Sequence, residues 1–534
     1  MAKFKQPSPR LSFFAASPKS MLILSAVFLL GASWIYAGEW LFQAFSHSFI
    51  GIFDQALRKL AGIYVAHGLI PYKDFGIVYP PGLAWWMGKL FSSDSLVEQQ
   101  WMVSLSFLAL NGLQLAILIP RFPSLRDKLL ATGASLLLFT LILGGDESDP
   151  LSLCLLLFNF SLITLLSDEG VDRDPAEKNL PKPISSRIRW EGALAFSTFL
   201  LFLLRWDRPV TLLFFSGIGG LLLRSRRQFR IGLAQGIGIL FGIFTLIAYA
   251  YFHRIGAELY EFVFRIPIEI IKDYRTLPLQ IFWDPQIPDS IFSWAVGVGL
   301  SGFAYALFRS RRFSPADRSA LALFALPLAM LPYALGRCDA THYKPFYVSV
   351  LGMLVLLGAP PRFAFPWFRF FCVLLLPGLS LIRPLKPIFP VNPQPLPFTQ
   401  HVLSDCHKIT QTSNVVPQSI FVGRLSYQHY LVNTALLYLT YPQLKPATAF
   451  ISDEPGIQNS CEYGDQIVKQ LRQAPRPLLA FLEMGDQPSE PNLTRSMTSC
   501  KKIESFLEST ESLLLGECSL VDIPSNRFQV RIYR

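Results

Sequence analysis

The sequence predicts a mainly α-helical, polytopic transmembrane bundle of about 11 spans, followed by a small C-terminal α/β domain. Of the 534 residues, 51% are hydrophobic and only 16% are charged, whereas soluble domains carry about 25% charged residues. The mean hydropathy is correspondingly positive, at +0.37. The apolar residues gather in repeated runs that approach the roughly 20 residues a helix needs to cross a bilayer. These observations exclude an ordinary soluble globular protein.

The expected spanning helices follow these apolar runs. They lie near residues 21–38, 97–120, 129–144, 150–166, 191–204, 209–223, 231–252, 290–308, 319–336, 344–358 and 364–382. The first run follows Lys3, Lys5, Arg10 and Lys19 and ends without a good cleavage site. We therefore expect an uncleaved first helix whose N-terminus is cytoplasmic.

Clusters of Lys and Arg in alternate loops predict the orientation of the other spans. The loops with the highest density of Lys and Arg are 224–230 (RSRRQFR) and 309–318 (RSRRFSPADR). Both fall on the cytoplasmic side when the N-terminus is inside, as the positive-inside rule requires. Membrane orientation thus explains the net charge of +11, and we expect no nucleic-acid partner. An odd number of spans predicts a multi-pass membrane protein with an extracytoplasmic C-terminal domain.

The first outer loop is unusually rich in sequence features. Residues 54–81 hold enough sequence for an amphipathic helix, and they include the carboxylates Asp54 and Asp74 and the run Tyr79-Pro80-Pro81. Residues 79–93 are interpreted as an interfacial or re-entrant helix, because a full span there would place every later arginine cluster outside.

The chain divides into a transmembrane module at 1–382, a proline-rich linker at 383–400 and an extracytoplasmic α/β domain at 401–534. In that domain the runs SIFVGR, PLLAFLE and RFQVRIYR predict strands, and Gly464 to Arg472 predicts a helix. An even set of cysteines lies on the oxidising side of the membrane, so one or two disulfides are expected, with partners that the spacing does not assign. These cysteines are Cys406, Cys461, Cys500 and Cys518.

Charged residues recur in five predicted outer loops. Ionisable groups at membrane depth are costly and mark a functional site by default. The candidates, in chain order, are Asp54 and Asp74; Glu147 and Asp149; Arg205 and Arg208; Lys272 and Arg275; and Arg337 and His342. Carboxylates suit a general base or a metal ligand, and Arg and Lys suit a phosphate. This combination predicts transfer of a group from a lipid-linked phosphate to an acceptor hydroxyl.

The first outer loop resembles that of the integral-membrane glycosyltransferases of the C fold (GT-C). These enzymes use polyprenyl-phosphate sugars and include the protein O-mannosyltransferases and the aminoarabinose transferase of lipid A. The resemblance is carried by Asp54, by residues 68–75 (GLIPYKDF), by Tyr79-Pro80-Pro81 and by the acidic cluster 146–149 in the next outer loop. It covers residues 20–150, and the rest of the chain is similar in architecture alone. It departs at Gln55, where the family usually has a second carboxylate, and at Tyr79, where the mannosyltransferases have His.

The resemblance implies a glycosyltransferase of the bacterial inner membrane with a polyprenyl-phosphate-sugar donor. Asp54 is then the expected catalytic base, and Asp74 is expected in the same site. Arg205, Arg208, Lys272, Arg275, Arg337 and His342 are candidates for binding the donor phosphate. No cofactor is required by the pattern, but Asp149 and Glu147 would suit a divalent cation, Mg²⁺ or Mn²⁺. Membrane lipids are expected partners, and the sequence does not reveal the acceptor.

Each candidate also has a structural interpretation. Asp54 could cap a helix and Asp74 could form a turn. Glu147 and Asp149 could cap a helix that starts at Pro150, and Arg205 and Arg208 could extend from a helix end. Lys272 and Arg275 could lie on an ordinary solvated face, and Arg337 and His342 could form a local ion pair with Asp339. Two other functions stay open. A transporter or flippase for a lipid-linked glycan would need a polar path and paired discontinuous helices, and a non-catalytic scaffold would leave the charged loops without a role.

Overall fold

The structure is a computed structural model of the chain. It describes residues 49–90, 109–114, 150–168, 184–214, 226–271 and 406–534, except for short gaps at 111, 407–408, 411–414, 426–433, 453–455, 485–499 and 521–522. The predictions outside these residues concern the spans near 21–38 and 129–144, most of the span at 97–120, the four spans between 290 and 382, the linker, and the site candidates Glu147, Asp149, Lys272, Arg275, Arg337 and His342.

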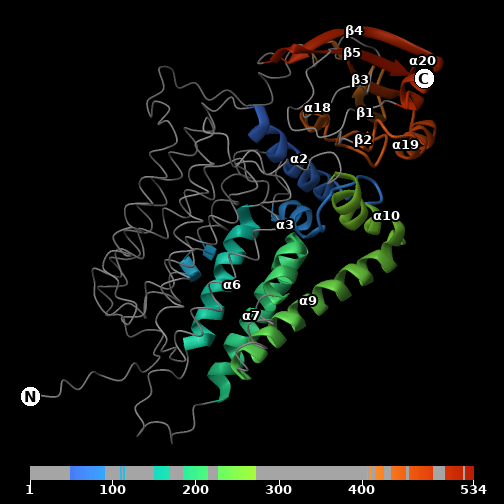
Figure 1. The fold of residues 1–534 in the computed structure, drawn as a ribbon. Coiled ribbons are helices and arrows are strands. Elements are labelled where there is room, and N and C mark those ends of the chain that lie inside the picture. The colour runs from blue at the N-terminus through green and yellow to red at the C-terminus, as the bar shows by residue number, and fades with distance from the viewer. Residues whose placement is uncertain are drawn as a thin grey trace, which may run out of the picture.

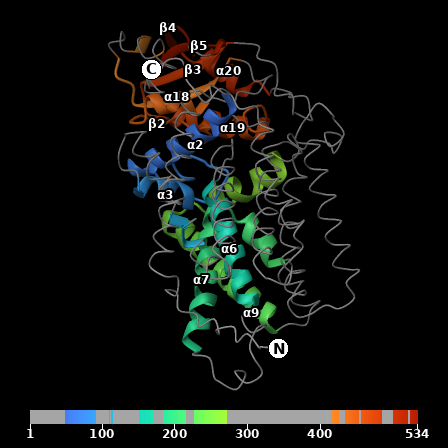
Figure 2. The same ribbon diagram turned by 90° about the vertical axis from the view of Figure 1, so that its left-hand side faces the viewer.

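Three long helices form the described part of a bundle, and a β-sheet lies beyond one end of them (Figures 1 and 2). The helices are α6 (Pro150–Asp168), α7 (Ile184–Leu204) and α9 (Arg226–His253). The runs predicted at 150–166, 191–204 and 231–252 are confirmed as helices. Both α7 and α9 begin earlier than predicted, because the basic segments before the apolar runs continue the helix. A further helical segment runs from Asp207 to at least Phe214.

The bundle packs through small residues and a buried polar cluster. The side chain of Asn159 on α6 accepts hydrogen bonds from Ser197 at 3.1 Å and Thr198 at 3.0 Å on α7. On α9, a Cβ at Gly238 would meet the Ala195 carbonyl, and one at Gly242 would meet the ring of Phe202. Close approach of glycine-bearing helices and hydrogen bonds between helices are the means by which helices associate in lipid.

Helix α9 presents an apolar face to its surroundings. Within the described residues, one helix is both long and apolar enough to cross a membrane, and it is the 25-residue segment Phe229–His253. Its exposed large apolar side chains recur along the helix, at positions 229, 233, 237, 240, 241, 243, 244, 247, 251 and 252. Such a continuous exposed stripe is expected where lipid replaces water as the solvent.

Further helices lie between the bundle and the sheet (Figure 1). They are α2 (Phe49–Ala66), α3 (Gly82–Leu90), α10 (Gly256–Tyr260) and the π-helix η2 (Glu261–Ile271). Helix α3 falls where the sequence predicts a short interfacial helix. After α9 the chain continues in helical form through α10 and η2.

The C-terminal part contains a mixed sheet with the described strand order β2-β1-β3-β5-β4. The strands are β1 (Ser419–Arg424), β2 (Lys445–Pro446), β3 (Leu478–Glu483), β4 (Ser512–Leu520) and β5 (Ile523–Tyr533). β1 pairs in parallel with β2 and β3, and β5 pairs antiparallel with β3 and β4. The three predicted strands are confirmed as β1, β3 and β5. Every residue of β1 and β3 is buried, as expected for parallel strands covered on both faces.

Helices and disulfides complete this part of the chain. The helices are α18 (Thr434–Thr440), α19 (Cys461–Gln473) and α20 (Lys502–Ser509). Helix α19 contains the predicted helical segment, and the Ser460 side chain caps it by accepting a hydrogen bond from the Tyr463 amide. All four cysteines are paired, Cys406 with Cys518 and Cys461 with Cys500.

Candidate functional site

Two of the predicted arginines occupy a corner of the chain, residues 205–208, which we call the arginine corner. Helix α7 ends at Leu204, and helical structure resumes at Asp207. Arg205 donates two hydrogen bonds to the Asp207 carboxylate, from Nε to Oδ1 at 3.0 Å and from Nη2 to Oδ2 at 3.2 Å. This bidentate pairing fixes the plane of the guanidinium. The Arg205 guanidinium also lies over the ring of Tyr79, 4.7 Å from its centroid.

Asp207 is the residue of this corner whose role the sequence analysis missed. Burial alone would raise the pKa of its carboxyl, but the charges of Arg205 and Arg208 and the hydrogen bond from Arg205 outweigh burial and lower the pKa. The carboxylate is therefore ionised, and the corner carries two positive charges and one negative charge. The Arg-x-Asp spacing in the sequence was the signal that could have shown this pairing.

The arginine corner joins other predicted outer loops. Arg208 is 1% exposed, and its Nη1 donates to the Ser152 hydroxyl in the first turn of α6, which starts directly after the second acidic loop. The Trp206 indole donates to the Val263 carbonyl of η2 at 3.2 Å. With the Tyr79 contact, the corner touches the first outer loop, the start of α6 and η2. Residues of the first predicted outer loop, of α6 and of η2 therefore meet at this end of the helices.

The first outer loop folds tightly around Tyr72. This residue has a φ of 71°, which is uncommon for a non-glycine residue, and its side chain is buried. Its amide donates to the Phe75 carbonyl at 2.6 Å, and its hydroxyl donates to the Tyr79 carbonyl at 2.5 Å. The Tyr249 hydroxyl at the end of α9 donates to the Pro71 carbonyl at 3.1 Å. Tyr72 thus links the two ends of the loop, and Tyr249 attaches the loop to the bundle.

The two predicted catalytic carboxylates lie on different elements. The backbone of Asp54 is in the second turn of α2, which begins at Phe49. The interpretation of Asp54 as a helix N-cap is therefore wrong. The Asp54 side chain is not among the side chains that the structure describes. The Asp74 carboxylate accepts a hydrogen bond from the Ile70 amide at 2.9 Å and forms an ion pair with Lys445 of β2 at 2.9 Å. Its turn-forming role is thereby confirmed.

The metal prediction has no test within the described residues. In this part of the chain no group of three or more His, Cys, Asp or Glu side chains could hold a metal ion. The two candidate ligands, Asp149 and Glu147, lie outside it.

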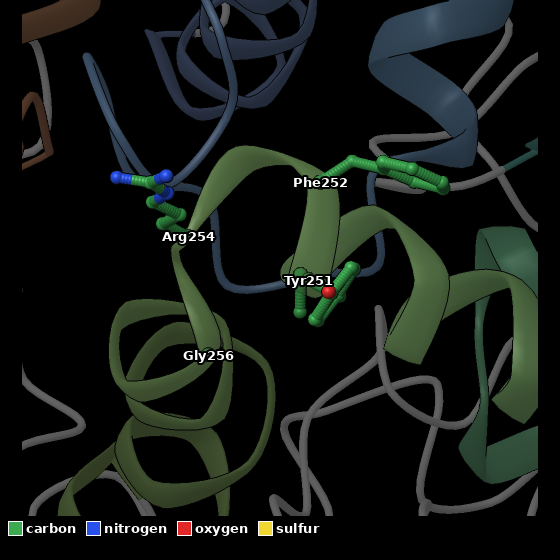
Figure 3. A pocket seen from close by; sticks show the side chains of 5 residues that line it. Tyr251, Phe252, Arg254 and Gly256 are labelled. Carbon is green, nitrogen blue, oxygen red and sulfur yellow. The ribbon is translucent and has the colours of Figure 1, made fainter.

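A hollow of about 500 Å³ opens at the end of α9, lined by Ala250, Tyr251, Phe252, Arg254 and Gly256. Figure 3 shows that the Arg254 and Phe252 side chains extend in opposite directions from the ribbon. The labelled side chains do not converge on a common point, and the C-terminal end of a helix carries partial negative charge, which disfavours an anion. The hollow is therefore a weaker candidate for a phosphate than the arginine corner.

Comparison with known proteins gives one clear result. No protein-family model matches the sequence, and no curated protein matches it. Among solved structures, the crystal structure of ArnT from Cupriavidus metallidurans bound to undecaprenyl phosphate is similar, with a TM-score of 0.52 and 15% sequence identity. The similarity covers 97% of this chain and 98% of that chain. It shows that the chain has the GT-C fold that the first outer loop predicted.

Proposed function

We propose that the chain is a membrane glycosyltransferase that moves a sugar from a polyprenyl-phosphate-linked donor to an acceptor hydroxyl at the outer face of the inner membrane. The observation that carries the proposal is the near-complete coverage of the similarity to ArnT, at 97% of this chain and 98% of that chain. A structure solved with undecaprenyl phosphate thus matches nearly the whole length of this chain. The sugar and the acceptor class are left open.

The arginine corner has the charge and rigidity that a phosphate site needs. Its two guanidiniums outnumber the Asp207 carboxylate, so the net charge is positive. Asp207 holds Arg205 in one plane, and Ser152 holds Arg208. Charges that are already oriented stabilise a developing anion without reorganisation during the reaction. Lys272, Arg275, Arg337 and His342 are proposed to complete the cationic side of the site.

Asp54 is proposed as the general base. It would take the proton from the acceptor hydroxyl as the acceptor oxygen forms its bond to the anomeric carbon. The bond from that carbon to the phosphate oxygen would break, and polyprenyl phosphate would leave with the electron pair. The arginines would stabilise the phosphate charge. A single displacement of this kind inverts the configuration at the anomeric carbon.

The proposal is tested with the full-length chain in nanodiscs and undecaprenyl phosphate carrying radiolabelled aminoarabinose or mannose, offered with an extract of cell-envelope acceptors. We expect Asp54→Asn to lower transfer by at least about 10²-fold, because a positioned general base contributes about 10²–10⁴-fold. Asp465→Asn, an exposed carboxylate of α19, is the matched control and should transfer at the wild-type rate.

Two results would contradict the proposal at different levels. Wild-type transfer by Asp54→Asn would remove the base assignment while leaving the function intact. A wild-type chain that neither transfers a sugar from any polyprenyl-phosphate donor nor binds undecaprenyl phosphate would overturn the function itself.

A further inference from the structure

The carboxylate of Asp74 is engaged by two protein groups. One oxygen accepts from the Ile70 amide and the other pairs with the Lys445 ammonium, both at 2.9 Å. The Asp74 side chain is 13% exposed, whereas that of Lys445 is 49% exposed. A carboxylate held in this way is suited to fixing a turn more than to taking a proton from a substrate. Lys445 lies 371 positions later in the chain, on the edge strand β2.

Two further contacts join the same loop to the segment around β2, and a third joins η2 to it. The Gly76 amide donates to the Ala449 carbonyl at 2.6 Å, and His67 Nδ1 donates to the Pro442 carbonyl at 3.1 Å. The ring of Phe262 on η2 lies 5.3 Å from that of Phe450, and a Cβ at Gly76 would collide with Phe262. The loop is therefore enclosed between the sheet edge and η2, with the Asp74–Lys445 pair at its tip.

A second set of contacts joins η2 to the sheet domain. Arg265 pairs with Glu462 of α19 at 3.0 Å and with Glu261 at 3.3 Å. The Tyr463 hydroxyl donates to the same Glu261 carboxylate. The hydrogen bond with Glu462 is the main cause that raises the pKa of Arg265 above its ordinary value. Both elements that flank the arginine corner, the first outer loop and η2, are thus attached to the C-terminal domain.

Direct contacts connect the first outer loop to the arginine corner. Asp74 lies inside the turn closed by the Tyr72–Phe75 backbone bond. The Tyr72 hydroxyl holds the Tyr79 carbonyl, and the Tyr79 ring lies beneath the Arg205 guanidinium. A shift of the turn at Asp74 would therefore change the position of Tyr79 under Arg205.

We propose that Lys445 and Asp74 are a positioning pair, through which the C-terminal sheet domain holds the first outer loop and the arginine corner in the geometry needed for transfer. Lys445 lies in no motif that predicts a site, and Asp74 acts through it instead of touching the substrate. The inference assigns the C-terminal domain a part in the site and rests on the proposed function for its catalytic consequence.

The structural half of the proposal is tested by hydrogen exchange on the full-length chain in nanodiscs. Lys445→Met and Asp74→Asn should each speed exchange in a peptide covering residues 70–76 by about tenfold, because local opening no longer breaks the ion pair. Asn can still accept from the Ile70 amide, so Asp74→Asn removes the ion pair alone. Lys445→Arg should restore protection. Lys502→Met, which removes the Lys502–Asp465 pair elsewhere on the domain, should leave the peptide unchanged.

The catalytic half is tested by a double-mutant cycle on transfer from the undecaprenyl-phosphate sugar that the wild type uses. We expect each single variant and the double variant to lower kcat by the same factor, about tenfold, with KM changed less than about twofold, because the loss comes from misplaced groups. Losses that multiply in the double variant would overturn the inference. So would an Asp74→Asn variant that is inactive beside a fully active Lys445→Met, since Asp74 would then act on the substrate.

The two measurements separate the inference from the proposed function. Unchanged exchange in Lys445→Met overturns the inference, whatever the chain transfers. If the chain has no transferase activity but residues 70–76 lose protection in Lys445→Met, the attachment is supported. Only the glycosyltransferase assignment is then rejected.

Discussion

On α9 the side chains of Leu240, Phe241 and Phe244 are 61–68% exposed, whereas on β1 and β3 every residue is buried. The bundle turns its polar groups inward, as the buried Asn159 cluster shows. The C-terminal domain places its apolar side chains between a sheet and helices, as a water-soluble domain does. The two regions therefore face different solvents, lipid for the bundle and water for the C-terminal domain. A site between them joins a lipid-facing part of the chain to a water-facing part.

Both regions contain a buried arginine that is paired with a carboxylate. In the bundle, Arg205 is 5% exposed and pairs with Asp207 at 3.0 Å. In the sheet, Arg424 and Glu483 are registered partners on β1 and β3, 3.2 Å apart and each 1% exposed. A buried charge without a partner would be costly in either setting. The two regions share the pairing of these buried charges, and they differ in the side chains that they expose.

The largest expected effect separates the stability of the two regions. Replacing Cys406 and Cys518 by Ser opens a loop of 112 residues and should destabilise the sheet domain by about 4 kcal/mol, because the unfolded chain gains freedom. Hydrogen exchange of the β3 and β5 amides should accelerate, while that of the α7 and α9 amides should not. Equal acceleration in both regions would show that they unfold as one unit.

The next effect tests the solvent on each side. Phe244→Lys near the centre of α9 should cost about 2.5–3.5 kcal/mol of membrane insertion, because a charge on a lipid-facing position is poorly solvated. Leu514→Lys on β4, where the side chain is 51% exposed, should be tolerated within about 0.5 kcal/mol. The measurements are the fraction inserted in isolated membranes and the unfolding midpoint in detergent. Insertion of the α9 variant at the wild-type level would contradict a lipid-facing stripe.

The smallest effect concerns the pH dependence of the arginine corner. Because the folded pKa of Asp207 is below its ordinary value, its ionised form stabilises the fold above the unfolded pKa of about 3.9, and this contribution disappears as pH falls through the lower folded pKa. The unfolding midpoint of the wild type should exceed that of Asp207→Asn at pH 6, and the gap should close below about pH 4. A gap that widened on acidification would contradict the pairing of Asp207 with Arg205.

The sequence predicted the local elements and part of the site. The apolar runs at 150–166, 191–204 and 231–252 predicted the helices, since a run of that length and composition has few alternatives. The strands at SIFVGR and RFQVRIYR were predicted from β-branched and aromatic side chains. The strands β2 and β4 were missed: β2 has two residues, and β4 contains Gly516 and Glu517, which weaken a strand pattern.

The sequence by itself thus determined which segments are helices or strands, that the C-terminal domain holds an even set of cysteines, and that charged residues recur between the apolar runs. Only the tertiary structure decided which of these groups meet. The pairings of Asp74 with Lys445, Arg265 with Glu462 and Cys406 with Cys518 join positions at least 112 residues apart. Helix and strand preferences are set by neighbours within a few positions, whereas such pairs depend on how distant segments pack, and no short pattern records that.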